Sequence, residues 1–194
     1  LAATAFEIKP GVSWQEVTPS VIRYLYQTGE AYANQQDKIA DFAGFGFNLG
    51  RQHPVYDLLG KNLPMVNNPY AWYLRLPDIP NFLRKITQVL ESRLAASIYS
   101  GYTGELTTTF YRSGLKFVFN RGMLEQVTPW KPVPHGYSGD SAFPGLTFLQ
   151  LLFGYRSLEE LKYAYPDCYT NSETKAALLH ALFPKKESNI WPVS

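Results

Sequence analysis

Apolar and polar positions alternate with two different periods along the chain, and the pattern changes near residues 77–80. Before that point, short apolar runs with a period of two are interspersed with helical patterns. We predict strands at 4–8, 45–50 and 70–76, with a helix up to about residue 36 and a short helix from His53 that Gly60 ends. The order strand, helix, strand, helix, strand is typical of an α/β unit.

The long helix of this first part has two possible start signals. Ser13 and Glu16 have the Ser-x-x-Glu spacing of a capping box, and Thr18 is followed by Pro19, a residue favoured at the first helical position. Gly29 lies in the middle of the apolar pattern. It either weakens the helix or allows another segment to pack closely.

After Pro77–Pro80 the pattern predicts one helix over 81–97, with Asp78 as its cap. Three alternating segments follow, at 105–111, 115–119 and 123–130. They are separated by turn signals at 113–114 and 120–122, so we predict an antiparallel meander. The segment 131–140 is rich in proline and glycine and reads as a loop.

Three short helices are predicted next, at 146–153, 157–165 and 172–183. Gly154 ends the first, and Ser157 with Glu160 forms a capping box for the second. A meander has one apolar face that must be covered. We therefore expect the helices to cover the sheet residues Phe110, Phe117 and Phe119 with the side chains of Leu146, Phe148, Leu152, Leu158 and Leu161.

Composition narrows the function classes. The 194 residues are 45% apolar with a net charge of +2, and the Lys and Arg residues are scattered, which argues against a nucleic-acid partner. No run reaches the ~18–20 apolar residues of a membrane span.

Cys168 is the only cysteine, so no intramolecular disulfide or cysteine-based metal site is expected, and a cytoplasmic location fits. The chain begins at Leu1 without a visible signal peptide, and we expect it to be a piece of a longer protein.

The blocks "LPDIPNFLRKITQVLESRL", "GELTTTFYRSGLKFVFNRG" and "LTFLQLLFGYRSLEEL" carry a resemblance to a known family. On these blocks and on "ALFPKK", residues 76–184 resemble a sterol-carrier-protein-like domain. Together with the first part, they resemble the C-terminal region of GNAT-type acetyltransferases of the enhanced-intracellular-survival type. The resemblance implies an α+β chain: 1–76 as the C-terminal half of a GNAT-like domain and 77–194 as a sterol-carrier-like domain.

Within that resemblance, Tyr56 and Gly60 match the spacing of the family's catalytic tyrosine, which acts as a general acid; the alternative is a tyrosine packed on the sheet. The acetyl-CoA loop of the family is replaced by "KPGVSWQEVTP", and Leu49 replaces an expected Asn. A phosphate cradle needs free N–H groups on a glycine-lined turn. The resemblance thus implies an inactive copy that binds no cofactor, with acetyl-CoA bound elsewhere in the parent protein.

The same resemblance implies a role for the terminal carboxylate of Ser194. In the family, this group reaches the catalytic domain and takes a proton from the substrate amine, as a general base can. The partners would be a missing N-terminal GNAT domain of the same chain and an amine, either a small molecule or a protein lysine. The alternative is a frayed terminus.

Other polar residues have plainer interpretations. His53 fits a helix cap or a surface position, and Cys168 a small buried apolar group. His135 and His180 lack a second ligand at metal-binding spacing, so no metal site is expected. Two further functions remain open: a stand-alone sterol-carrier-like module that binds a lipid or acyl chain, and an oligomerisation scaffold acting as a homo-oligomer.

Overall fold

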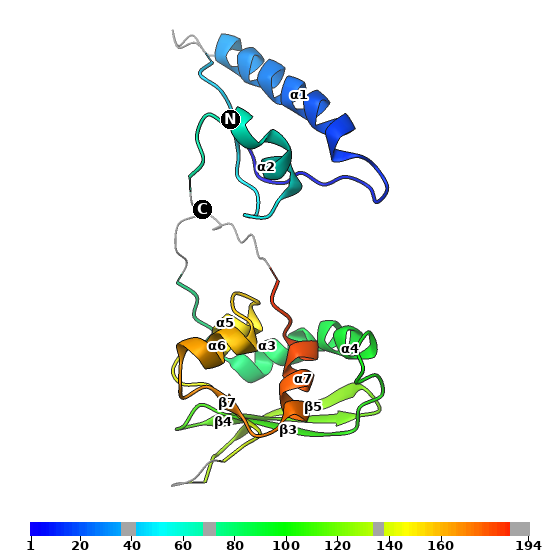
Figure 1. Cartoon of the computed structure of the whole chain (residues 1–194), viewed down its shortest axis with the longest axis vertical. Coiled ribbons are helices and arrows are strands. Elements are labelled where there is room, and N and C mark those ends of the chain that lie inside the picture. Colours follow the sequence, from blue (N-terminus) through cyan, green and yellow to red (C-terminus); the bar gives the residue numbers. More distant parts are fainter. Residues whose placement is uncertain (36–41, 68–72, 134–137, 187–194) are drawn as a thin grey trace. The chain divides into compact units, whose positions relative to one another are not determined.

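The computed structural model describes residues 1–35, 42–67, 73–133 and 138–186, and the chain divides into two compact units (Figure 1). The first covers Leu1–Ala71 and the second Trp72–Ser188. Each unit contains both helices and strands. The predicted α+β class is therefore confirmed at this coarse level.

The first unit is a small α/β arrangement with little sheet. It contains β1 (Ala2–Ala3), α1 (Trp14–Gln35), β2 (Gly46–Phe47), α2 (Pro54–Leu59) and the 3-10 turn η1 (Gly60–Asn62). β1 and β2 pair in parallel. The strand predicted at 4–8 is wrong, because residues 5–9 have no regular structure and the Phe6 carbonyl bonds to a histidine ring instead of a strand. The strand predicted at 45–50 is confirmed only over two residues.

Helix α1 starts at the first of its two predicted signals. It begins at Trp14, directly after Ser13, whose carbonyl accepts from the Val17 amide at 3.3 Å. Pro19 lies inside the helix, so a start at Thr18 is wrong. Pro19 is the sixth residue of α1, so it lacks the N–H that would otherwise bond to the Gln15 carbonyl. A Cβ on Gly29 would lie 2.1 Å from the Phe42 ring, so the glycine allows close packing.

Where the second unit is described, from residue 73, it begins without the predicted strand. Of the segment 70–76, residues 70–72 lie outside the described ranges, and 73–76 have no regular structure. Asp78 caps α3 (Ile79–Lys85) as predicted, because its carboxylate accepts from the Asn81 amide at 2.9 Å. The single helix predicted over 81–97 is wrong: it breaks at Ile86 into α3 and α4 (Thr87–Ala95). The Thr87 hydroxyl donates to the Arg84 carbonyl at 2.9 Å, which competes with regular helix bonding.

The predicted meander is confirmed. β3 (Gly104–Thr109), β4 (Gly114–Asn120) and β5 (Met123–Trp130) pair antiparallel in sequence order. Two short strands extend the sheet: β6 (Ser141–Ala142) pairs parallel to β3, and β7 (Tyr169–Thr170) pairs antiparallel to β6. The order is β5-β4-β3-β6-β7. Sequence periodicity missed β6 and β7, since two residues are too few to show alternation.

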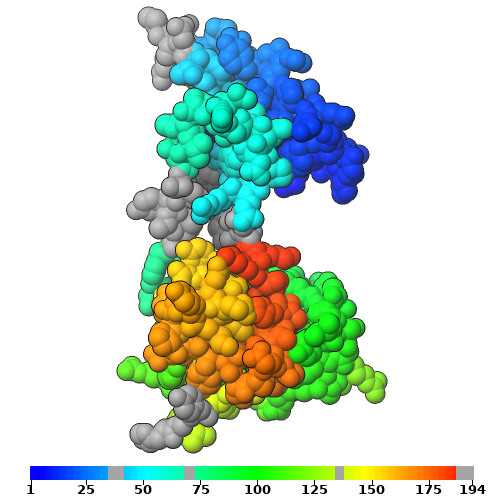
Figure 2. Space-filling model, viewed as in Figure 1, coloured from blue at the N-terminus to red at the C-terminus, as the bar shows by residue number. Residues whose placement is uncertain are grey.

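Helices cover one face of this sheet (Figure 1). The three predicted short helices are present as α5 (Thr147–Leu152), α6 (Leu158–Ala164) and α7 (Glu173–Leu182). They form one continuous yellow-to-red surface in the space-filling view (Figure 2). Both reciprocal bonds of the capping box are made: Glu160 N–H to Ser157 Oγ at 3.2 Å, and Ser157 N–H to Glu160 Oε2 at 2.8 Å.

The core lies between the helices and the sheet. Of the expected contacts, Phe117, Phe119, Phe148, Leu152, Leu158 and Leu161 are buried in one cluster. The prediction that Leu146 covers the sheet is wrong, because this residue caps the start of α5 and is 50% exposed. Phe110 is partly buried, with its ring centroid 5.4 Å from that of Phe148.

Candidate functional site

The Tyr56 side chain lies on α2 and bonds to the main chain that follows β2. Its hydroxyl donates to the Phe47 carbonyl at 2.9 Å and accepts from the Leu49 amide at 3.0 Å. The Leu49 carbonyl lies at 3.4 Å from the same oxygen. The hydroxyl is thus bonded to two main-chain groups. This arrangement fits the predicted structural role of Tyr56, packed on the sheet, better than the role of a general acid directed at a substrate.

His53 links α2 to the segment after β1. Its Nδ1 accepts from the Val55 amide at 3.3 Å, and its Nε2 lies 2.8 Å from the Phe6 carbonyl. Because an amide can only donate and a carbonyl only accept, the ring carries its proton on Nε2. The Trp14 ring packs edge-on at a centroid distance of 4.9 Å. His53 is therefore a helix cap, which was one of its two predicted roles.

The segment before α1 does not have the form of a phosphate cradle. Gly11 has a positive φ of +85°, and the Val12 amide is used by the Lys9 carbonyl at 3.2 Å. The Trp14 ring packs on Phe6 at 4.9 Å, which places an indole at the helix start. A cradle would need several free amides on a glycine-lined turn. These residues do not fit the pyrophosphate of acetyl-CoA.

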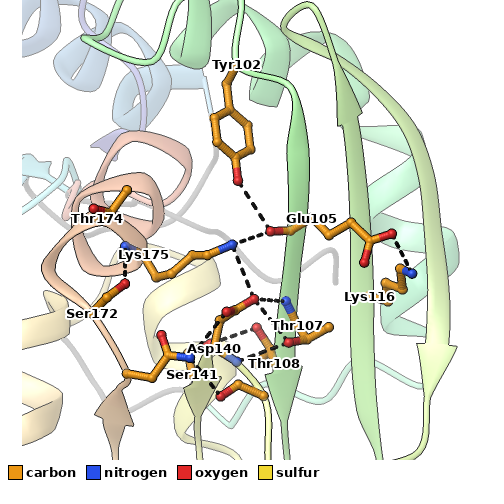
Figure 3. Close-up of polar contacts among 12 residues, drawn as sticks. Tyr102, Glu105, Thr107, Thr108, Lys116, Asp140, Ser141, Ser172, Thr174 and Lys175 are labelled. Carbon is orange, nitrogen blue, oxygen red and sulfur yellow. Dashed lines mark hydrogen bonds and ion pairs between the residues drawn. The ribbon is translucent and has the colours of Figure 1, made fainter.

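A dense polar cluster lies in the second unit, around Asp140 (Figure 3). One carboxylate oxygen accepts from the Thr107 amide at 2.8 Å and from the Thr107 hydroxyl at 3.1 Å. The Lys175 ammonium lies 3.4 Å from the same oxygen and also donates to the Glu105 carbonyl. The Asn171 side chain donates to the other oxygen at 3.3 Å. Asp140 thereby joins β3, the start of β6, the end of β7 and α7.

The charge of Asp140 is stabilised where it lies. Burial alone would raise the pKa of this carboxyl, but the Thr107 amide, the Lys175 charge and the Thr107 and Asn171 side chains together hold it below the usual value. Beside it, the buried Thr108 and Ser141 hydroxyls bond at 2.9 Å. All of these partners are used within the fold, so the cluster acts as a structural link between segments far apart in sequence. Sequence analysis missed it, and its only signal was a polar run in a predicted loop.

Cys168 and His180 also have structural roles. Burial raises the pKa of the Cys168 thiol, whose sulfur lies 3.6 Å from the Thr147 hydroxyl, which supports the buried reading. His180 pairs with Glu159, and Lys185 lies 2.6 Å from Glu160. His135 and Ser194 lie outside the described residues. Within the described ranges, no three His, Cys, Asp or Glu side chains are grouped as a metal site would require.

Comparisons with protein-family models, curated proteins and solved structures found no match to this chain. Across the part of the chain that the structure describes, no helix is both long and apolar enough to cross a membrane.

Proposed function

We propose that this chain is the accessory C-terminal portion of an acetyl-CoA-dependent N-acetyltransferase that acts on amines. In this proposal the acetyl transfer takes place in a GNAT domain elsewhere in the same polypeptide. The first unit is a non-catalytic GNAT-like half-domain, and the second is a sterol-carrier-like domain that supports the catalytic domain. The sequence resemblance over residues 76–184 suggests this role.

The single observation that carries the proposal is the position of the Tyr56 hydroxyl. The resemblance gives Tyr56 the sequence position of the family's general acid, but its hydroxyl is bonded to the main chain at Phe47 and Leu49. A group held by two main-chain partners is poorly placed to protonate a leaving thiolate. The segment before α1 supports the same conclusion, because the Val12 amide of its turn is used by the Lys9 carbonyl and the Trp14 ring lies at the helix start.

The proposal gives the terminal carboxylate of Ser194 the role of general base. A carboxylate is ionised at neutral pH and can accept a proton from an ammonium or a bridging water at hydrogen-bond distance. The residue itself lies outside the described residues, so the role depends on the resemblance alone.

The test compares acetyl transfer by the chain extended upstream with three altered C-termini. Removal of the last three residues should lower kcat by about 100-fold or more, the usual contribution of a general base. Adding two residues after Ser194 should lower it similarly, because the carboxylate is displaced. Ser194→Ala keeps the carboxylate and should leave kcat unchanged. Equal turnover in all forms would refute the general-base role, and no turnover in the extended wild type would refute the acetyltransferase itself.

The alternative of an acyl-chain-binding module has less support. The space between sheet and helices is filled by Phe117, Phe119, Phe148 and Phe183, whose neighbouring ring centroids lie 5.7–6.5 Å apart. An acyl chain would have to displace these rings. Native mass spectrometry of the chain after incubation with palmitate tests this directly. A stable one-to-one adduct would favour the binding module.

A further inference from the structure

A groove of about 550 Å³ crosses the second unit between α4 and two turns next to the sheet. It is independent of the proposed acetyltransferase role. It is shallow and open to solvent. The groove is lined by residues of α4 and of the turns at 100–101 and 121–123: Gln88, Glu91, Ser92, Ala95, Ser100, Gly101, Arg121, Gly122 and Met123.

The walls of the groove are held together by hydrogen bonds. The Gly122 amide donates to the Tyr102 carbonyl at 2.8 Å, and the Arg121 amide to the Thr103 hydroxyl at 2.8 Å. On the opposite side, Glu91 Oε1 accepts from the Leu124 amide at 2.8 Å and joins α4 to β5. A Cβ on Gly122 would lie only 3.3 Å from the Gly101 nitrogen, so the two turns touch through their main chains. These bonds hold the segments that line the groove against one another.

Arg121 is the unusual residue of this groove. It has a φ of +49° and is followed by Gly122 at +83°, as the two central residues of the tight turn between β4 and β5. The first of these positions favours Gly, which has no Cβ, and Asn or Asp, whose short polar side chains can hydrogen-bond to the nearby main chain. Strained residues of this kind concentrate at functional sites. An arginine is poorly suited to the turn itself, and Arg121 also lines the groove.

The side chains around the groove have complementary chemistry. A guanidinium binds a carboxylate or phosphate with two parallel hydrogen bonds, and the ion pairs found among the described residues do not involve Arg121. Ser92 and Ser100 can donate to the same ligand. Glu91 also lines the groove, and its carboxylate would repel a purely anionic ligand but accept from an ammonium or hydroxyl.

We propose that this groove binds a small zwitterionic molecule that carries both an oxyanion and an ammonium group, as an amino acid or a short peptide does. Arg121 holds the oxyanion, and Glu91 accepts from the ammonium. This requirement for both groups excludes strongly anionic ligands and gives the site its selectivity.

The test is a titration of the ¹⁵N-labelled chain, with amide shifts at Ser92, Gly101 and Gly122 as the readout. The probes are glycylglycine, N-acetylglycine, which lacks the ammonium, and inorganic phosphate. We expect saturable shifts with glycylglycine at a Kd of ~1 mM or below, and at least ~10-fold weaker binding of the other two.

Arg121→Asn separates binding from folding. Asn tolerates the positive φ better than Arg, so this variant should unfold at a higher temperature than wild type while its glycylglycine affinity falls at least ~10-fold. Arg112→Asn is the control, since it makes the same charge change at another exposed position in a turn of this sheet. Its affinity should equal that of wild type.

Three results would overturn the proposal: no saturable shift with any probe, an equal loss of affinity in both arginine variants, or unchanged binding in Arg121→Asn. Binding of phosphate as tight as that of glycylglycine would overturn the part assigned to Glu91 and leave a simple oxyanion site at Arg121.

Discussion

At the scale of single residues, polar side chains in this protein mainly hold the main chain in place. Tyr56 bonds to Phe47 and Leu49, and His53 joins the start of α2 to Phe6. Asp140 does the same between strands of the second unit. Polar groups placed in this way replace hydrogen bonds that short strands cannot provide, and leaving their partners unpaired costs free energy.

Replacing Tyr56 with Phe should loosen the main chain after β2. The Phe47 carbonyl and the Leu49 amide would each lose a partner, at a cost of about 1–3 kcal/mol in the free energy of local opening. Hydrogen exchange of the Leu49 amide should therefore speed up. Tyr24→Phe is the control, because Tyr24 is a tyrosine 66% exposed on α1. Unchanged exchange at Leu49 in Tyr56→Phe would mean that the hydroxyl does not hold this segment.

Asp140 should make the second unit sensitive to acid. Its pKa in the folded state lies below the unfolded value of about 3.9, so its stabilisation is fully present above that value and is lost as the pH falls through the folded pKa. Asp140→Asn should be about 1–2 kcal/mol less stable than wild type at pH 7. Denaturant midpoints of the two proteins should converge below pH 4.

The exposed Asp167→Asn is the control for this measurement. It should shift the midpoint little at either pH, because the Asp167 side chain is exposed and the substitution leaves unchanged its main-chain carbonyl, which accepts from Tyr111. A constant difference between Asp140→Asn and wild type across the pH range would contradict the assigned role of the carboxylate.

At the scale of elements, the corner between α5 and α6 decides how the helical cover closes. Gly154 has a φ of +69°, and its carbonyl accepts from the Lys186 amide at 3.1 Å. A Cβ at this position would lie 2.8 Å from the Lys186 nitrogen and 2.9 Å from its oxygen. The glycine therefore serves both the turn and the close approach of the chain after α7, while the capping box at Ser157 starts the next helix.

Gly154→Ala should consequently destabilise the second unit by about 2–4 kcal/mol, from left-handed strain and the clash with Lys186 combined. Gly145→Ala is the matched control. Its φ is +54° but nothing lies within 4 Å of its Cβ position, so it should cost only the strain, about 1–2 kcal/mol. Urea unfolding of both variants measures the difference. Equal losses would show that the approach of Lys186 does not matter.

At the scale of the molecule, the two units have cores of very different size. Among the described residues of the first unit, only Phe6 and Val55 count as buried apolar side chains. The second unit buries a cluster that includes Phe117, Phe148 and Phe183 and draws on every one of its helices. A unit with so little buried apolar surface is marginal by itself.

We therefore expect residues 73–186 to fold alone and residues 1–67 not to. The larger fragment should show a cooperative thermal transition by circular dichroism and a dispersed NMR spectrum. The smaller fragment should show neither, because its two-residue strands cannot form a stable sheet without further partners. A folded fragment 1–67 would show that this unit needs no further structure to pack against.

The candidate sites show the limits of sequence analysis most clearly. The capping roles of His53, Asp78 and Ser157 were predictable, since each depends on residues within three positions. The cluster at Asp140 was not, because its partners lie up to 35 positions away in the chain and meet only through the parallel pairing of β3 and β6.

The sequence alone determined the α+β class, the meander and the positions of α5, α6 and α7, because these depend on hydrophobic period and on local turn and cap residues. Tertiary structure decided the rest. It broke one predicted helix at Ile86, left residues 73–76 without a strand and added β6 and β7 to the sheet. These outcomes depend on pairing and packing between distant segments, whose free energies outweigh weak local preferences.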